Sequence, residues 1–448
     1  MLSVRRKGQR WGGEGYGFAL PFVALFVVLA CALLVLTLAW HIPMMLWDQL
    51  DIVPMYKAWH DGTLADTEFF GFRAGHVHVL AYAVLLATTY FSHGQPWLDC
   101  AASWVFLVLY ATLVAAQMRR TLPAHDLLAQ SIWLAMVFVT LYPGHLPNLQ
   151  WGWQVAVFMS LVGTVVAIDN LARRPLSWAN IAFGLLAGAF AYLSFATAVA
   201  LVPTAVLLLA LRDDQPRTRR IACAALWGLG GASAFVLTRG YNGTEVAATP
   251  PFFAWVHYTL NFLGGGISRF ATDIAPLLAL AAMGSGVWAY LRSSDRRKSL
   301  PWLGCLVFGI GCAFVVAAAR VGGNGAQHAF VMRYVSFSSV FWLGWLGLIV
   351  LMDRRGPSRT QFVTVSVGIV ATFAVVNAVQ MMRKTARIAE ETRVTEATLR
   401  ATWPNVDEQL LRSLYFDQPE LTRQRLDGLK ALGFPPFDKP ASDADKVR

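Results

Sequence analysis

Residues 17–40 read GFALPFVALFVVLACALLVLTLAW and contain no charged side chain. A helix needs about 20 apolar residues to cross the hydrocarbon core of a bilayer, so this segment is long enough to span one. The basic residues Arg5, Arg6 and Lys7 precede it, as in a signal peptide. However, the run is too long for a signal peptide and lacks a small-residue cleavage site, so we expect a retained membrane anchor.

The rest of the chain repeats this pattern. Of its 448 residues, 56% are hydrophobic and only 14% are charged, which excludes a soluble domain of this size. The apolar runs do not alternate with polar residues, which excludes barrel strands and predicts an all-α, polytopic transmembrane bundle. The runs occupy roughly residues 17–40, 74–92, 97–117, 126–143, 152–172, 178–196, 197–211, 221–238, 271–292, 301–319, 335–352 and 361–381.

The net charge of +11 lies mostly in short loops between these runs, which indicates membrane orientation rather than nucleic-acid binding. The basic loops near residues 119–120, 173–174, 212–220, 292–298 and 354–359 should share one side with the N-terminus. If all twelve runs crossed the membrane, these basic loops would alternate between its two sides. They share one side only if residues 74–92 lie along the outer surface as an interfacial juxtamembrane helix, which leaves about eleven spans. The inner side then holds nineteen Lys and Arg, and the loops between spans on the outer side hold six.

After the last run the composition becomes charged and leucine-rich. We expect a transmembrane domain over residues 1–387 and a small helical tail over 388–448 on the outer face, although the basic residues Arg383, Lys384 and Arg387 would then also lie outside. The five cysteines fall inside apolar runs without ligand spacing, so we predict neither disulfides nor a metal site, and no motif calls for a cofactor.

The first outer loop, residues 41–73, carries WDQLD at residues 47–51, within one or two turns of the end of the first span. Asp48 and Asp51 are three positions apart and would share a helical face. Paired carboxylates raise each other's pKa and can provide a base for a hydroxyl nucleophile. The alternative is a pair of solvated acids at a helix boundary.

Other outer residues are candidates for binding. Arg73, His76 and His78 occur in FRAGHVH, where contact with a phosphate or hydroxyl is favoured over metal binding. The stretch PGHLPNLQWGWQ combines amides with tryptophans, as carbohydrate sites do. The aromatic segment 251–266 ends in three glycines, which would let an interfacial helix re-enter. The candidates for sugar or acceptor binding are Arg73, His76, His78, Asn148, Trp151, Gln154 and Tyr241.

Arg320 and Arg333 flank the last outer loop, at the ends of two spans. An arginine at the membrane boundary is costly without a partner, and its planar guanidinium suits a phosphate or diphosphate. The alternative is an arginine that extends to the lipid headgroups.

The order of these features (WDQLD, RAGHVH, QWGWQ, PPFF, RVGGNG and MRY) resembles the GT-C superfamily of polytopic glycosyltransferases, and uncharacterised bacterial GT-C-like proteins in particular. The resemblance spans most of the chain, but the histidine motif is less complete than expected.

The resemblance implies an inverting, metal-independent enzyme of the bacterial inner membrane with its active site facing the periplasm. Such an enzyme transfers a sugar from a polyprenyl-phosphate-linked donor to a glycan or lipid acceptor of the cell envelope. Asp48 or Asp51 would be the base, and Arg333 with Arg320 would hold the donor phosphate. The rival interpretations are a transporter or flippase of lipid-linked glycans, an O-antigen-type polymerase, and a non-catalytic glycan-binding relative.

Overall fold

The computed structural model describes residues 15–71, 77–124, 126–173, 175–239, 251–352 and 357–438. Within these ranges the chain is all-helical, with one isolated β-bridge between Ser293 and Met352 and no strand. In chain order the elements are α1 (Gly15–Ala39), η1 (Trp47–Asp51), α2 (Ile52–His60), α3 (Asp66–Phe70), α4 (Val79–Ser92), α5 (Trp97–Thr121), α6 (Leu127–Thr140), η2 (Pro143–His145), α7 (Leu146–Leu149), η3 (Gly152–Gln154), α8 (Val155–Ala172), α9 (Trp178–Ser194), η4 (Ala196–Ala200), α10 (Leu201–Ala210), α11 (Arg217–Arg239), α12 (Phe252–Ser268), α13 (Ala275–Leu291), α14 (Arg296–Asn324), η5 (Ala326–Phe330), η6 (Met332–Tyr334), α15 (Val335–Leu351), α16 (Pro357–Thr402), α17 (Glu408–Leu414) and α18 (Pro419–Leu432).

Seven segments of the described chain are helical, long and apolar enough to cross a membrane, and four shorter apolar helices accompany them. The bundle is apolar on its outside as well as in its core. Large apolar side chains such as Leu20, Phe183, Leu229 and Leu277 are more than half exposed on the outward faces of their helices. A soluble protein does not expose so many, so these faces are suited to lipid and the chain is a membrane protein.

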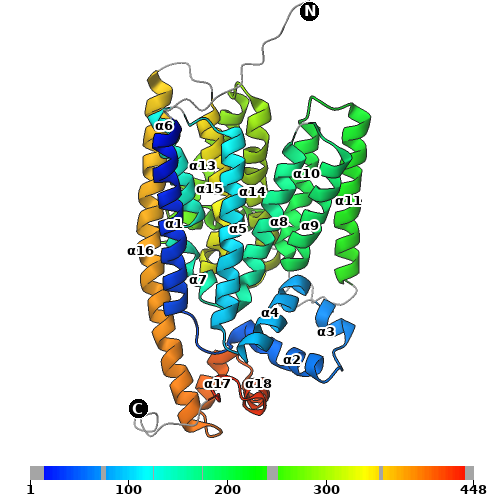
Figure 1. Cartoon of the computed structure of the whole chain (residues 1–448), viewed down its shortest axis with the longest axis vertical. Coiled ribbons are helices and arrows are strands. Elements are labelled where there is room, and N and C mark those ends of the chain that lie inside the picture. Colours follow the sequence, from blue (N-terminus) through cyan, green and yellow to red (C-terminus); the bar gives the residue numbers. More distant parts are fainter. Residues whose placement is uncertain are drawn as a thin grey trace, which may run out of the picture.

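The helices form a bundle whose connections lie at two opposite ends (Figure 1). Helices α8 and α15 are buried along almost their whole length and form the centre. Helices α2, α3 and α4 lie at one end, together with α17 and α18, which follow the long helix α16. The loops between α8 and α9 and between α10 and α11 lie at the opposite end.

Polar side chains set several helix starts. The carboxylate of Asp126 accepts from the backbone of Ala129 at 2.8 Å at the start of α6, and the Ser177 hydroxyl accepts from Asn180 at 3.1 Å at the start of α9. Asp295 caps α14 in the same way. These caps satisfy backbone N–H groups that have no partner within the helix, so they fix where each helix begins.

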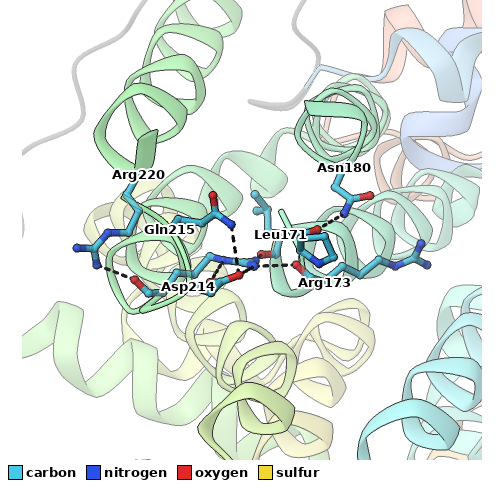
Figure 2. A network of polar contacts seen from close by, with 8 residues as sticks. Leu171, Arg173, Asn180, Asp214, Gln215 and Arg220 are labelled. Atoms are coloured by element: carbon cyan, nitrogen blue, oxygen red, sulfur yellow. Dashed lines mark hydrogen bonds and ion pairs between the residues drawn. The ribbon is translucent and has the colours of Figure 1, made fainter. Parts of the chain in front are cut away.

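Arg212 ties the connection between α10 and α11 to the end of α8; Figure 2 labels its partners Leu171, Arg173 and Asp214. Arg212 is fully buried, and its guanidinium donates to both carboxylate oxygens of Asp214, at 2.9 and 2.7 Å. It also donates to the carbonyl of Leu171 and, at 2.9 Å, to that of Arg173. These two carbonyls lie at the end of α8. The carboxylate of Asp214 therefore compensates the buried charge of Arg212, and Arg212 in turn caps the helix.

Three predicted elements differ from the structure. The helix expected over 74–92 begins only at Val79, because His78 adopts a non-helical backbone conformation. The three glycines do not turn the chain back, since α12 continues through them and packs Gly264 against the backbone of Ala275. Their lack of a side chain instead permits close helix contact.

The last helix is much longer than the apolar run at 361–381 because α16 continues to Thr402. Ion pairs at i,i+4 spacing, Arg387 with Glu391 at 3.3 Å and Arg400 with Glu396 at 2.6 Å, support this polar extension. The helix passes residues 387–388 without a break, and the division into a membrane domain and a tail stays a prediction.

Candidate functional site

The WDQLD stretch folds as the short 3-10 helix η1, which directly follows an extended Leu46. Trp47 has a left-handed backbone with φ of 52°, a conformation that costs a residue with a side chain about 1–2 kcal/mol. Packing offsets this cost, because the Trp47 ring meets the edge of Trp151 at 5.2 Å and Trp151 Nε1 donates to the Leu46 carbonyl at 3.3 Å. The surrounding structure therefore fixes the direction in which η1 presents its polar side chains.

Gln49 of η1 is held from the start of α5. Its side-chain amide donates to the buried carboxylate of Asp99 at 2.7 Å, and the hydroxyl of Thr88 on α4 donates to the other oxygen of Asp99. Gly152 lies against this group, and a Cβ at that position would be 2.4 Å from the Asp99 Cβ and 2.8 Å from Gln49 Nε2. Only a glycine fits beside the Gln49–Asp99 pair.

Asp51 is held from the other side, by the C-terminal helices. Its carboxylate accepts from the Tyr415 hydroxyl at 2.8 Å and from Arg425 at 3.2 Å. Asp51 is buried, so this pairing compensates a desolvated charge. The C-terminal helices are therefore tied to η1 through Asp51, whose carboxylate is occupied by protein partners.

Asp48 has a different environment, although it lies on the same short helix. Its exposed fraction is only 7%, and within the described residues its carboxylate makes no hydrogen bond. Burial raises its pKa from 3.8 to about 6; the positive charge of Arg333 opposes the rise, Asp51 adds to it, and Arg320 opposes it. A buried carboxylate without a hydrogen bond is rare and is typical of functional sites.

The structure thus brings Asp48 together with both predicted arginines. Arg320 lies near the end of α14 and Arg333 in η6, and both act electrostatically on Asp48. The guanidinium of Arg333 lies over the ring of Tyr334 at 5.8 Å and forms no ion pair with a described residue. Its charge is therefore available to an anion at this end of the bundle.

The predicted sugar-binding residues of the stretch PGHLPNLQWGWQ, residues 143–154, are buried instead of lining a surface. Asn148 donates to the carbonyl of Arg333 at 2.9 Å and to the Ser336 hydroxyl at 2.7 Å. Trp151 packs on Trp47, and Gln154 is 2% exposed. The structure places Asn148 and Trp151 as supports for η6 and η1; contact of these three residues with a sugar stays a prediction.

His78 is also buried, enclosed by the rings of Trp153 at 5.1 Å, Phe195 at 5.4 Å and Tyr82 at 5.8 Å. Arg73, His76 and Tyr241 lie outside the described residues. In the part of the chain that the structure describes, no three His, Cys, Asp or Glu side chains gather as a metal site would require.

Sequence reasoning missed several residues near the site. Asp99, Tyr415 and Arg425 position η1, and none of them stands in a motif. Tyr258 of α12 bonds to His328 of η5 at 2.9 Å, beside the two arginines. His328 lies in the same loop as Arg320 and Arg333, so its position was the one signal that could have identified it.

In the comparisons with known proteins, no family model and no curated protein matches this chain. The function is therefore argued from the geometry of the site.

Proposed function

We propose that this chain is an integral-membrane glycosyltransferase of the GT-C type. It would transfer a sugar from a polyprenyl-phosphate-linked donor to a hydroxyl of a glycan or lipid acceptor. The observation that carries the proposal is Asp48, a buried carboxylate that makes no hydrogen bond within the described residues and that feels the positive charges of Arg333 and Arg320. A base beside two phosphate-binding cations is the minimum that such a transfer needs.

Asp48 is the base in this mechanism, and Asp51 is not. The carboxylate of Asp51 is engaged by Tyr415 and Arg425, whereas that of Asp48 makes no hydrogen bond with a described residue. A pKa near 6 makes Asp48 a stronger base than an ordinary aspartate while it remains mostly ionised at pH 7. Of the two candidates that the sequence left open, the proposal therefore takes Asp48 as the base.

In the proposed step, the Asp48 carboxylate takes the proton of the acceptor hydroxyl. The hydroxyl oxygen then attacks the anomeric carbon, and the bond from that carbon to the phosphate oxygen breaks with its electron pair on the phosphate. Attack from the side opposite the phosphate inverts the anomeric centre. Arg333 and Arg320 stabilise the charge on the leaving polyprenyl phosphate, so the proposal needs no metal ion.

The proposed orientation has about eleven spans, with the site facing the periplasm across a bacterial inner membrane. It is supported because each of the eleven predicted spanning runs coincides with a helix. It is also supported by the placement of α2–α4 at the end opposite the connection between α10 and α11 (Figure 1), which contains Arg212. The positive-inside rule assigns that basic end to the cytoplasm.

The test is donor-dependent transfer by the purified protein in nanodiscs, measured as release of polyprenyl phosphate and appearance of glycosylated acceptor. Arg333→Lys should fold normally and use the donor less well, because lysine offers one point charge in place of two parallel donors. Arg333→Ala should weaken donor use further, by roughly 2–5 kcal/mol.

Arg269→Lys is the matched control, since Arg269 follows α12 and contacts Met381 rather than the site. Unchanged donor use in both Arg333 variants would contradict the proposed phosphate contact. Movement of an intact lipid-linked glycan across the membrane without transfer would instead support the transporter or flippase interpretation.

A further inference from the structure

The loop between Arg320 and Arg333 holds a histidine in a defined position. Gly325 has a left-handed backbone with φ of 69°, and the next residues form η5. The side chain of Asn261 on α12 donates to the Ala326 carbonyl at 3.1 Å, which fastens the loop to α12. His328 therefore projects from a fixed turn, not from a free loop.

Tyr258 is hydrogen-bonded to one ring nitrogen of His328. The Tyr258 hydroxyl lies 2.9 Å from His328 Nδ1, and Tyr258 is fully buried. Burial raises the pKa of Tyr258 far above its usual range, so the phenol keeps its proton and can either donate to Nδ1 or accept from Nδ1–H. When the phenol donates to Nδ1 of a neutral ring, the proton of that ring sits on Nε2, which has no hydrogen-bond partner among the described residues.

The charges around the ring favour this neutral form. The pKa of His328 is lowered by burial first, then by Arg333 and Arg320. The other titratable groups around it are Tyr258 on α12 and Tyr334 in η6, whose rings lie 6.2 and 5.9 Å from the imidazole. His257, the neighbour of Tyr258, is exposed and lies on another face of α12.

We infer that His328 is a third ligand of the phosphate, a neutral hydrogen-bond donor through Nε2–H, and that Tyr258 is the positioning residue that sets its tautomer. This inference rests on the proposed phosphate contact of Arg320 and Arg333. Sugar transfer turns a phosphate diester with one negative charge into a monoester whose second charge develops as the bond breaks. A donor fixed beside that oxygen stabilises the monoester more than the diester.

The chemistry that His328 recognises is therefore the terminal oxygen of a phosphate monoester. Arg320 and Arg333 attract both the diester donor and the monoester product, since both phosphates carry at least one negative charge. The histidine adds one directed donor, which is worth roughly a ten-fold difference in affinity when the acceptor is charged. It should distinguish the product from the donor, and so act on turnover more than on donor affinity.

The experiment measures binding of two soluble short-chain probes to the purified full-length protein by titration calorimetry. One probe is citronellyl phosphate, a monoester, and the other is its methyl diester. Wild-type protein should prefer the monoester. His328→Leu should lose about ten-fold in monoester affinity and little in diester affinity, whereas His328→Gln should recover part of the loss because its amide can donate.

Tyr258→Phe should lower the monoester preference in part, since the ring of His328 can then carry its proton on either nitrogen. His257→Leu is the matched control and should behave as wild type. A His328→Leu variant that keeps the full monoester preference overturns the inference and leaves the proposed function intact. Failure of wild-type protein to bind either ester would instead refute the phosphate site itself.

Discussion

Replacing Asp48 by asparagine should stabilise the protein while it removes activity. Asparagine keeps the shape of the side chain and removes a charge that is 7% exposed and has no hydrogen bond within the described residues. The rise of the Asp48 pKa from 3.8 to about 6 corresponds to roughly 3 kcal/mol of lost stability at neutral pH. Asp48→Asn should recover most of this amount and abolish sugar transfer.

The effect of Asp48→Asn on the free energy of unfolding should depend on pH. Because the folded-state pKa is the higher one, the folded protein holds a proton that the unfolded chain has lost between pH 3.8 and about 6. Wild-type stability from this group therefore falls across that window and is constant above it. The difference between Asp48→Asn and wild type should be near zero at pH 4 and largest above pH 6.

The assay is thermal unfolding in detergent at several pH values, followed by the intrinsic tryptophan signal. Asp48→Asn should raise the midpoint by a few degrees at pH 7. Asp51→Asn is the matched control on the same helix and should lower it, because it breaks the pairing with Tyr415 and Arg425, at a cost of about 2 kcal/mol. An unfolding midpoint of Asp48→Asn that lies below that of wild type, or a difference between the two midpoints that does not change with pH, would refute the reasoning.

Three further predictions concern the fold and the orientation. Arg212→Met should cost about 3–5 kcal/mol of stability, since it removes the ion pair with Asp214 and the hydrogen bonds to two helix-end carbonyls, and adding Asp214→Leu should restore part of it in the same unfolding assay. Gly152→Ala should displace Gln49 and lower transfer, whereas Gly228→Ala, which meets no atom within 4 Å, should be neutral in transfer. In a cysteine-free background, an impermeant maleimide added to intact cells should label a cysteine at the exposed position 61 and not one at 297; the reverse result would invert the orientation.

The apolar runs predicted most of the helices, because a spanning segment must satisfy its backbone internally and be apolar throughout. The run at 335–352 became α15, and that at 178–196 became α9. Helix ends were harder to predict. The continuation of α16 to Thr402 is supported by i,i+4 ion pairs, which a hydrophobicity pattern does not register.

The candidate site was predicted only in part. The sequence predicted Asp48, Arg320 and Arg333 as candidates, since a charge at the edge of an apolar segment is conspicuous, and the structure places the two arginines where their charges act on Asp48. The sequence could not separate Asp48 from Asp51, because the partners of Asp51 lie more than 360 residues away along the chain. The sequence also could not show that Asn148 and Gln154 are buried. Segments that face lipid and segments that face the protein core are both apolar, so the residues around a polar side chain look the same in either case.

The most direct test of the central claim is an experimental structure of Asp48→Asn with a bound polyprenyl-phosphate-linked sugar. This variant should bind the donor without transferring its sugar, since it keeps both arginines and lacks the base. The account predicts the phosphate within hydrogen-bond distance of Arg333 and Arg320, with the anomeric carbon facing residue 48. Donor density elsewhere on the bundle, with Arg333 turned toward lipid, would contradict it.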